Sequence, residues 1–319
     1  HFLILRGVQT AASINLVATL AKLLPLGLFV VLAMMMFKLD TFKLDFTGLA
    51  LGVPVWEQVK NTMLITLWVF IGVEGAVVVS ARARNKRDVG KATLLAVLSA
   101  LGVYLLVTLL SLGVVARPEL AEIRNPSMAG LMVEMMGPWG EIIIAAGLIV
   151  SVCGAYLSWT IMAAEVPFLA ATHKAFPRIF ARQNAQAAPS ASLWLTNICV
   201  QICLVLIWLT GSDYNTLLTI ASEMILVPYF LVGAFLLKIA TRPLHKAVGV
   251  GACIYGLWLL YASGPMHLLL SVVLYAPGLL VFLYARKTHT HDNVLNRQEM
   301  VLIGMLLIAS VPATWMLVG

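Results

Sequence analysis

Four ionisable side chains within long apolar runs are the residues of this sequence best placed to do chemistry. Glu74, Glu165 and Glu223 are the acids among them, and Lys22 is the base. A charge that faces lipid costs at least about 2.5 kcal/mol, so we expect each to face the interior of a helix bundle or a watery cavity. Such groups neutralise charged solutes or relay protons, whereas the structural alternative is a helix-to-helix hydrogen bond or a side chain that reaches the membrane surface.

The surroundings of Glu74 suit a cation with an apolar stem. In the stretch FIGVEGA, Gly72 and Gly75 stand on either side of it, and small residues either let helices pack closely or let a helix open locally. Interrupted helices bind substrate near the bilayer midplane in transporters. Trp68 and Ile71 would share one broad face with Glu74 in an unbroken helix. An indole ring can cover a cation while the carboxylate neutralises it.

Two further apolar runs combine an aromatic residue, a polar residue and a helix breaker. Their members are Gly154, Ser158, Trp159 and Pro167 in the first run, and Ser222, Glu223, Pro228 and Tyr229 in the second. Pro228 removes a backbone donor and tends to kink its helix, which leaves carbonyl groups for other partners. The recurrence of this combination in three runs favours a translocation pathway.

The composition requires that these runs lie in a membrane. Of the 319 residues, 61% are hydrophobic and 11% are charged, and the mean hydropathy is +0.96. Soluble domains carry about 25% charged residues, so a soluble globule could not cover this apolar surface. The four cysteines all lie in apolar runs without a CxxC spacing, which gives no disulfide framework or zinc site.

We expect an all-α integral membrane protein, because the apolar runs are long and continuous rather than short and alternating. A span needs about 20 residues. The runs predict nine spans, near residues 12–37, 62–81, 92–116, 141–167, 191–210, 216–237, 247–262, 266–285 and 299–318. No linker divides the chain, so we expect residues 1–319 to form a single polytopic domain.

The basic residues predict the orientation of these spans. Fifteen of the 21 Lys and Arg residues lie in one alternating set of segments, which begins with Arg6 and includes the cluster after Glu74, and five lie in the other set. Because positive charges accumulate on the cytoplasmic side, the first set is expected in the cytoplasm and Gly319 outside. The net charge of +7 therefore indicates membrane anchoring, and no nucleic-acid partner is expected.

Several stretches, in order, resemble the amino acid–polyamine–organocation transporters, and most closely their basic amino acid antiporters of the arginine/ornithine type. They are WVFIGVEGA, RNKRDVGKAT, LSWTIMAAEVPFLAATHKAFPRIFARQNAQAAPSA and TIASEMILVPYF, which look like the family's sixth helix, the loop after it, the eighth helix with its loop, and the tenth. The resemblance covers residues 3 to 240 well and implies a five-plus-five inverted-repeat fold of the LeuT type.

The resemblance also implies roles for individual residues. Trp68 is similar to the family's gating tryptophan, Ile71 to an aliphatic wall, and Glu74 to a carboxylate gate. Trp159 resembles the aromatic residue that stacks on the substrate, and Tyr229 the tyrosine of the outer gate. A small polar substrate position falls at Ala221 or Ser222, and Glu223 is outside the general family pattern. Lys22 is similar to a lysine that occupies the place of a sodium ion, which would make transport independent of sodium.

If the first residues open the family's fifth helix, the first four helices are absent from this chain. With them would be missing the unwound first helix, whose glycines hold the substrate's carboxylate in the family. The expected function is exchange of cationic amino acids, arginine against ornithine, in a bacterial-type inner membrane. The lipid bilayer is then a partner, no cofactor is expected, and a homodimer is left open.

The sequence leaves three other functions open. A proton-coupled permease for another amino acid or a polyamine would use the same residues and would work without a counter-substrate. A membrane enzyme would need converging ligands or a nucleophile with its base, and only the pair His289 and His291 suggests a metal, with a solvated loop as the alternative. A channel would need a repeated filter sequence, which the chain lacks.

Overall fold

The computed structural model describes the backbone of residues 1–83, 85–211, 214–289, 295, 299–301, 303–308 and 310. It does not describe the side chains at 8–12, 49, 64, 86–87, 214–217, 219–220, 265–271, 273–274, 276–277 and 289. Over the described backbone, all regular structure is helical. The all-α prediction is therefore confirmed.

Among the described residues, six helices are long and apolar enough to cross a membrane, and each matches an expected span. They are α2 (Val8–Met36), α6 (Lys86–Val114), α9 (Pro138–Thr172), α10 (Ser190–Thr210), α11 (Tyr214–Ile239) and α12 (Pro243–Ser263). Large apolar side chains on them point outward, such as Leu24 at 76% and Trp208 at 81% exposure. In a membrane, lipid covers such surface.

The other three expected spans have different outcomes. The span expected at 62–81 is not one continuous helix: α4 (Val55–Phe70) ends in a turn, and the short α5 (Gly75–Val78) and η2 (Ser80–Arg82) follow. The span expected at 266–285 lies in α13 (Pro265–His289), and the one expected at 299–318 lies largely outside the described residues. The short elements are α1 (Phe2–Leu5), α3 (Leu39–Lys43), η1 (Leu49–Leu51), α7 (Arg117–Glu122), α8 (Ser127–Met136) and η3 (Arg178–Ala181).

The chain forms two compact units. Unit 1 comprises residues 1–55, 72–168 and 182–197, and unit 2 comprises residues 56–71, 169–181 and 198–319. The sequence did not suggest this division. Each unit is described by itself below.

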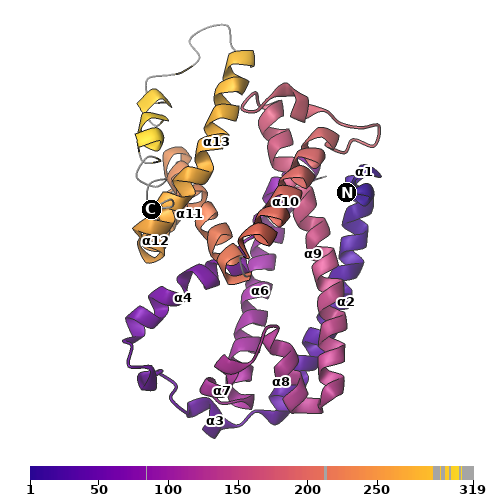
Figure 1. Cartoon of the computed structure of the whole chain (residues 1–319), viewed down its shortest axis with the longest axis vertical. Helices are drawn as coiled ribbons and strands as arrows, with labels where there is room; N and C mark the ends of the chain where they lie inside the picture. Colours follow the sequence, from indigo (N-terminus) through magenta and orange to yellow (C-terminus); the bar gives the residue numbers. More distant parts are fainter. Residues whose placement is uncertain are drawn as a thin grey trace. The chain divides into compact units, whose positions relative to one another are not determined.

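In unit 1, α2 and α9 run side by side (Figure 1), and glycines of α9 make their closest contacts. A Cβ atom added to Gly147 would lie 2.4 Å from Cγ of Pro25, and one added to Gly154 would lie 2.7 Å from Cβ of Ala18. On each helix the two contacts are seven residues apart, which is about two turns. Small residues in membrane helices allow this close approach of two backbones.

Two apolar clusters hold the remaining elements of unit 1. The first joins α1, α9 and α10 through buried Ile4, Leu157, Ile161, Ala164 and Leu193. The second joins α2, α8 and α9 through Phe29, Ala33, Ala129, Leu131, Met132 and Ile144, with partly buried residues of α6 packed against it. These clusters fix α9 against several neighbours along its length.

In unit 2, α11 and α12 form a close antiparallel pair (Figure 1) whose contacts again involve glycines. A Cβ atom on Gly256 would lie 3.2 Å from Cα of Phe230. Leu67 of α4 joins this pair in a buried cluster with Leu226 and Leu259. Gly264, with φ of +86°, ends α12 directly before Pro265 begins α13.

The glycine contacts give a prediction that compares one crowded glycine with one that has open space around it. Gly147→Ala should destabilise the protein by about 1–3 kcal/mol, because the added methyl group overlaps the Pro25 ring. Gly102→Ala, within α6 and with open space around it, should be neutral or stabilise by about 0.5–1 kcal/mol, since alanine favours helix. Thermal unfolding in one detergent measures both, and equal melting temperatures for the two variants would contradict the contact.

Candidate functional site

The break between α4 and α5 is the feature on which the candidate site depends. Residues 71–74 form a turn, and Gly72 has φ of +104°, a value that side-chain-bearing residues rarely adopt. The N–H of Gly72 donates to Oε2 of Glu74 at 2.9 Å. Trp68, Ile71 and Glu74 would share one face only in an unbroken helix, and this condition is not met because α4 ends at Phe70.

The two glycines of the FIGVEGA stretch also serve close packing. In unit 1, a Cβ atom on Gly72 would lie 3.0 Å from Cζ2 of Trp159, and one on Gly75 would lie 2.8 Å from Sδ of Met162. Both alternatives for these glycines, local opening and close packing, therefore hold at once. The turn that carries Glu74 lies directly against the indole of Trp159.

Glu165 forms a contact between helical segments, which is the structural alternative to a functional role for an acid in an apolar run. Its side chain is 1% exposed, and the guanidinium of Arg82 binds both of its oxygens at 3.0 Å, through Nε and Nη2. The charge of this intramembrane carboxylate is thus met by a fixed ion pair that ties η2 to α9. The contacts Gly72–Trp159, Gly75–Met162 and Arg82–Glu165 run in the same order along both segments.

A loop after α9 completes the surroundings of this ion pair. Nη1 of Arg82 donates to the carbonyl oxygen of Ala187 at 3.2 Å. Asn184, in the same loop, donates from Nδ2 to the carbonyl oxygen of Leu5 at 2.7 Å and accepts from the N–H of Ala188. One end of unit 1 is therefore held by a polar cluster that joins α1, η2, α9 and this loop.

Unit 2 contains the other candidate residues. Trp68 and Ile71 end α4, and the N–H of Ile71 donates to the carbonyl oxygens of Leu67 and Trp68 at 3.2 and 3.1 Å. On α11, Ser222 and Glu223 are buried, at 0% and 2% exposure, and the Ser222 hydroxyl donates to the carbonyl oxygen of Leu218.

Tyr229, the expected gate residue, belongs to a region of unit 2 that α4 and α11 share. It packs against the cluster of Leu67, Leu226 and Leu259. Leu67 is the residue directly before Trp68. The structure therefore brings Tyr229 close to the segment of α4 that carries the expected gating tryptophan.

Lys22 lies in unit 1 on the face of α2 that contacts α9. Ala18 and Pro25 touch α9 at Gly154 and Gly147, and Lys22 follows Ala18 by four residues and precedes Pro25 by three, the spacing of one helix face. Its side chain is half-buried. The base thus lies between the two closest contacts of these helices.

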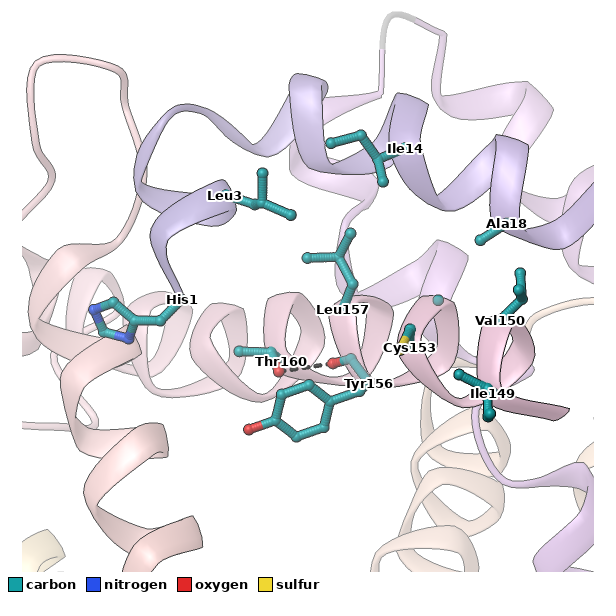
Figure 2. A pocket seen from close by; sticks show the side chains of 11 residues that line it. His1, Leu3, Ile14, Ala18, Ile149, Val150, Cys153, Tyr156, Leu157 and Thr160 are labelled. Carbon is teal, nitrogen blue, oxygen red and sulfur yellow. Dashed lines mark hydrogen bonds between the residues drawn. The ribbon is translucent and has the colours of Figure 1, made fainter. Parts of the chain in front are cut away.

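A separate cavity of about 390 Å³ lies between α1, the start of α2 and α9 (Figure 2). Its lining is mostly apolar and includes Leu3, Ile14 and Leu157 but no candidate site residue. At 100° per residue, Leu157 and Thr160 lie on the opposite face of α9 from Met162. A cavity without an acidic side chain does not suit a cation, so we do not place the candidate site there.

The described residues gather the candidate site in two groups. In unit 1 the Glu74 turn meets Trp159, with Arg82 and Glu165 beyond it. In unit 2, Ser222, Glu223 and Tyr229 lie on one helix, α11, which contains Pro228. The Arg82–Glu165 pair was missed from the sequence because 83 residues separate its partners. The pair His289 and His291 lies outside the described side chains.

The long apolar helices of the described residues define the class: a multi-pass membrane protein. The chain belongs to the amino acid permease family, since the sequence model described as "Amino acid permease" matches residues 1–307. This confirms the resemblance seen in the sequence and sets the enzyme alternative aside.

The chain is also similar to individual antiporters over most of its length. The chain is 44% identical over 306 residues to the arginine/ornithine antiporter of Pseudomonas aeruginosa, with 90% of this chain and 63% of the relative covered. It is 41% identical over 311 residues to the arginine/agmatine antiporter of Chlamydia caviae, covering 92% and 64%, and 38% identical over 333 residues to that of Chlamydia pneumoniae, covering 98% and 68%. The chain thus spans slightly less than two thirds of the first two relatives.

The buried ion pair gives the prediction of this subsection. Arg82→Ala should destabilise the protein by about 3–5 kcal/mol, because it leaves the buried Glu165 carboxylate without its ion-pair partner. Arg286→Ala is the matched control: this arginine also lies over a phenylalanine ring, but its pair with Glu299 is partly exposed and should contribute at most about 1 kcal/mol. Chemical unfolding measures the free energy of unfolding of both variants. Losses of the same size would contradict the structural role assigned to the Arg82–Glu165 pair.

Proposed function

We propose that the chain is the major part of a secondary transporter that exchanges cationic amino acids, arginine against ornithine, by alternating access. The relatives' printed names support arginine as one substrate. The six membrane-length helices and the bacterial relatives support a multi-pass protein of the inner membrane. Residues 1–319 act as one transporter domain in this proposal.

One observation carries the proposal: the acidic turn of the broken helix lies against the indole of Trp159. A carboxylate beside an aromatic ring can hold a guanidinium or ammonium group by charge and by cation–π contact. Freed backbone groups of a broken membrane helix are the usual partners of a transported solute's polar ends. Glu74 and Trp159 would thus bind the basic end of the substrate. For Ile71, in unit 2, the proposal is an aliphatic contact with the substrate's stem.

Unit 2 carries the other residues of the proposal. Trp68 and Tyr229 are proposed as gate residues, and Ser222 and Glu223 of α11 as polar contacts for the substrate. The burial of Ser222 and Glu223, and the packing of Tyr229 near the end of α4, support these assignments.

The finer topology remains part of the proposal: nine spans in a five-plus-five inverted-repeat fold, with the basic segments in the cytoplasm and Gly319 outside. Contacts within each unit support it. In unit 1, Arg82, Ala187 and Leu5, all on or beside segments assigned to the cytoplasm, meet at one end. In unit 2, Lys60 lies over the ring of Tyr261, and both belong to segments assigned to the outside.

Charge distinguishes the two exchange reactions named for the relatives. Arginine and ornithine each carry one net positive charge, so their exchange is electrically neutral. Agmatine lacks the carboxylate and carries two, so arginine/agmatine exchange moves charge across the membrane. In liposomes, a potassium diffusion potential should leave arginine/ornithine exchange unchanged, and a strong response of the preferred exchange would favour agmatine.

The role of the Glu74 charge can be separated from its hydrogen bond. Glu74→Gln keeps an oxygen that can accept from the Gly72 N–H but loses the charge. We expect a near-native melting temperature and a loss of arginine exchange of at least about tenfold, because a hydrogen bond to a charged group contributes about 1.5–3 kcal/mol. Uptake of labelled arginine into arginine-loaded liposomes measures the loss of exchange.

Glu141→Gln, at an exposed position in the first turn of α9, is the control and should exchange normally. Glu74→Ala should lose both exchange and stability, since it also removes the acceptor of the Gly72 N–H. Normal exchange by Glu74→Gln would contradict the proposed binding role and leave only the structural one.

Lys22 gives a prediction about coupling. If its ammonium group takes the place of a sodium ion, replacing sodium with N-methylglucamine should not change exchange, and Lys22→Gln should slow it in either salt. Stimulation by sodium would contradict this role. Uptake driven by a pH gradient without any internal counter-substrate would favour the proton-coupled permease instead.

A further inference from the structure

Pro228 leaves one carbonyl group of α11 without its helical donor. In an α-helix the N–H of residue i donates to the carbonyl oxygen of residue i−4, and proline has no N–H. The carbonyl that Pro228 would have served is that of Met224, within the apolar span Ala221–Ile239. In a membrane no bulk water is at hand to satisfy such a group.

Tyr275 supplies the missing donor. Its hydroxyl, on α13, donates to the carbonyl oxygen of Met224, 51 residues away in the sequence. A tyrosine suits this position because its ring is compatible with an apolar environment and its hydroxyl gives one directed hydrogen bond. The contact joins α13 to α11 within unit 2, about one turn before Pro228.

The residues on either side of this contact are the candidate residues of α11. Glu223, which is 2% exposed, directly precedes Met224, and Tyr229 directly follows Pro228. Tyr229 packs against the cluster of Leu67, Leu226 and Leu259. The backbone of α11 from Met224 to Pro228 therefore sets the position of Tyr229 relative to Glu223.

We propose that Tyr275 is a positioning residue for the exchange proposed above: through the Met224 carbonyl it holds the backbone of α11 next to Pro228 and thereby places Tyr229. It does not contact the substrate in this role. The inference rests on the proposed function for its effect on transport, but its effect on the α11 backbone stands apart from any substrate.

The first test removes one oxygen atom. Tyr275→Phe should insert normally and slow arginine exchange in liposomes about three- to twentyfold, the range that single hydrogen bonds between membrane helices support. Tyr284→Phe, on the same helix with a side chain 61% exposed, is the control and should exchange at the wild-type rate. An unchanged rate in Tyr275→Phe would overturn the proposal.

The second test asks whether Tyr275 acts through the carbonyl that Pro228 frees. Pro228→Ala restores an N–H for Met224, so Tyr275→Phe should slow exchange in the Pro228 protein but have little further effect in the Pro228→Ala protein. An equal slowing in both backgrounds would overturn the mechanism. Pro228→Gly, which also restores the N–H, repeats the cycle if the alanine variant fails to insert.

Thermal unfolding in detergent without substrate compares the same four proteins: the wild type, Tyr275→Phe, Pro228→Ala and the double variant. Tyr275→Phe should lower the melting temperature in the Pro228 background and much less in the Pro228→Ala background. If the wild-type protein exchanges no basic amino acid, the proposed function fails, and this cycle still decides the hydrogen bond. If the wild type exchanges arginine but neither cycle shows coupling, the positioning role alone is wrong.

Discussion

The structure depends on one constraint: a backbone group freed inside the bilayer must find its partner within the protein, because no bulk water is available there. The helical hydrogen-bond pattern is interrupted at two places that matter for the proposed site, after Phe70 and at Pro228, and at both a side chain supplies a partner. The carboxylate of Glu74 accepts from the N–H of Gly72, and the hydroxyl of Tyr275 donates to the carbonyl of Met224. At these two places the protein itself thus satisfies the backbone group that the interruption frees.

Close helix packing without large side chains follows from the same environment. Burying apolar surface gives little driving force between helices in lipid, so contact distance and hydrogen bonds must stabilise the bundle. Gly147 and Gly154 bring α9 against α2, and Gly256 brings α12 against α11. At Gly72 the same lack of a side chain serves a second purpose, because it lets the indole of Trp159 reach the backbone of the break.

The sequence was sufficient to predict what depends on local composition. Hydropathy placed six helices within a few residues of their observed positions, and Gly72 and Gly75 marked the span in which the helix opens. It could not predict what depends on pairing across the chain. The partner of Glu165 is an arginine 83 residues away, and the donor for the Met224 carbonyl is a tyrosine within an otherwise apolar run. Helical periodicity could not predict how Trp68, Ile71 and Glu74 lie relative to one another, because it applies only to an unbroken helix.

The lengths of the segments on either side of the break bear on the proposal that the acidic turn lies within the apolar layer. In unit 2, Trp56, Trp258 and Tyr261 form an aromatic cluster at the start of α4, of the kind found at membrane surfaces. From Trp56 to Phe70 the helix advances about 21 Å, less than the thickness of a hydrocarbon layer of about 30 Å. In unit 1, eight residues separate Glu74 from Arg82 in the polar cluster, which is roughly 12–16 Å of helix. Each length, taken by itself, supports the proposed position of the turn. At the edge of the layer, water would weaken any attraction between the Glu74 charge and a passing cation.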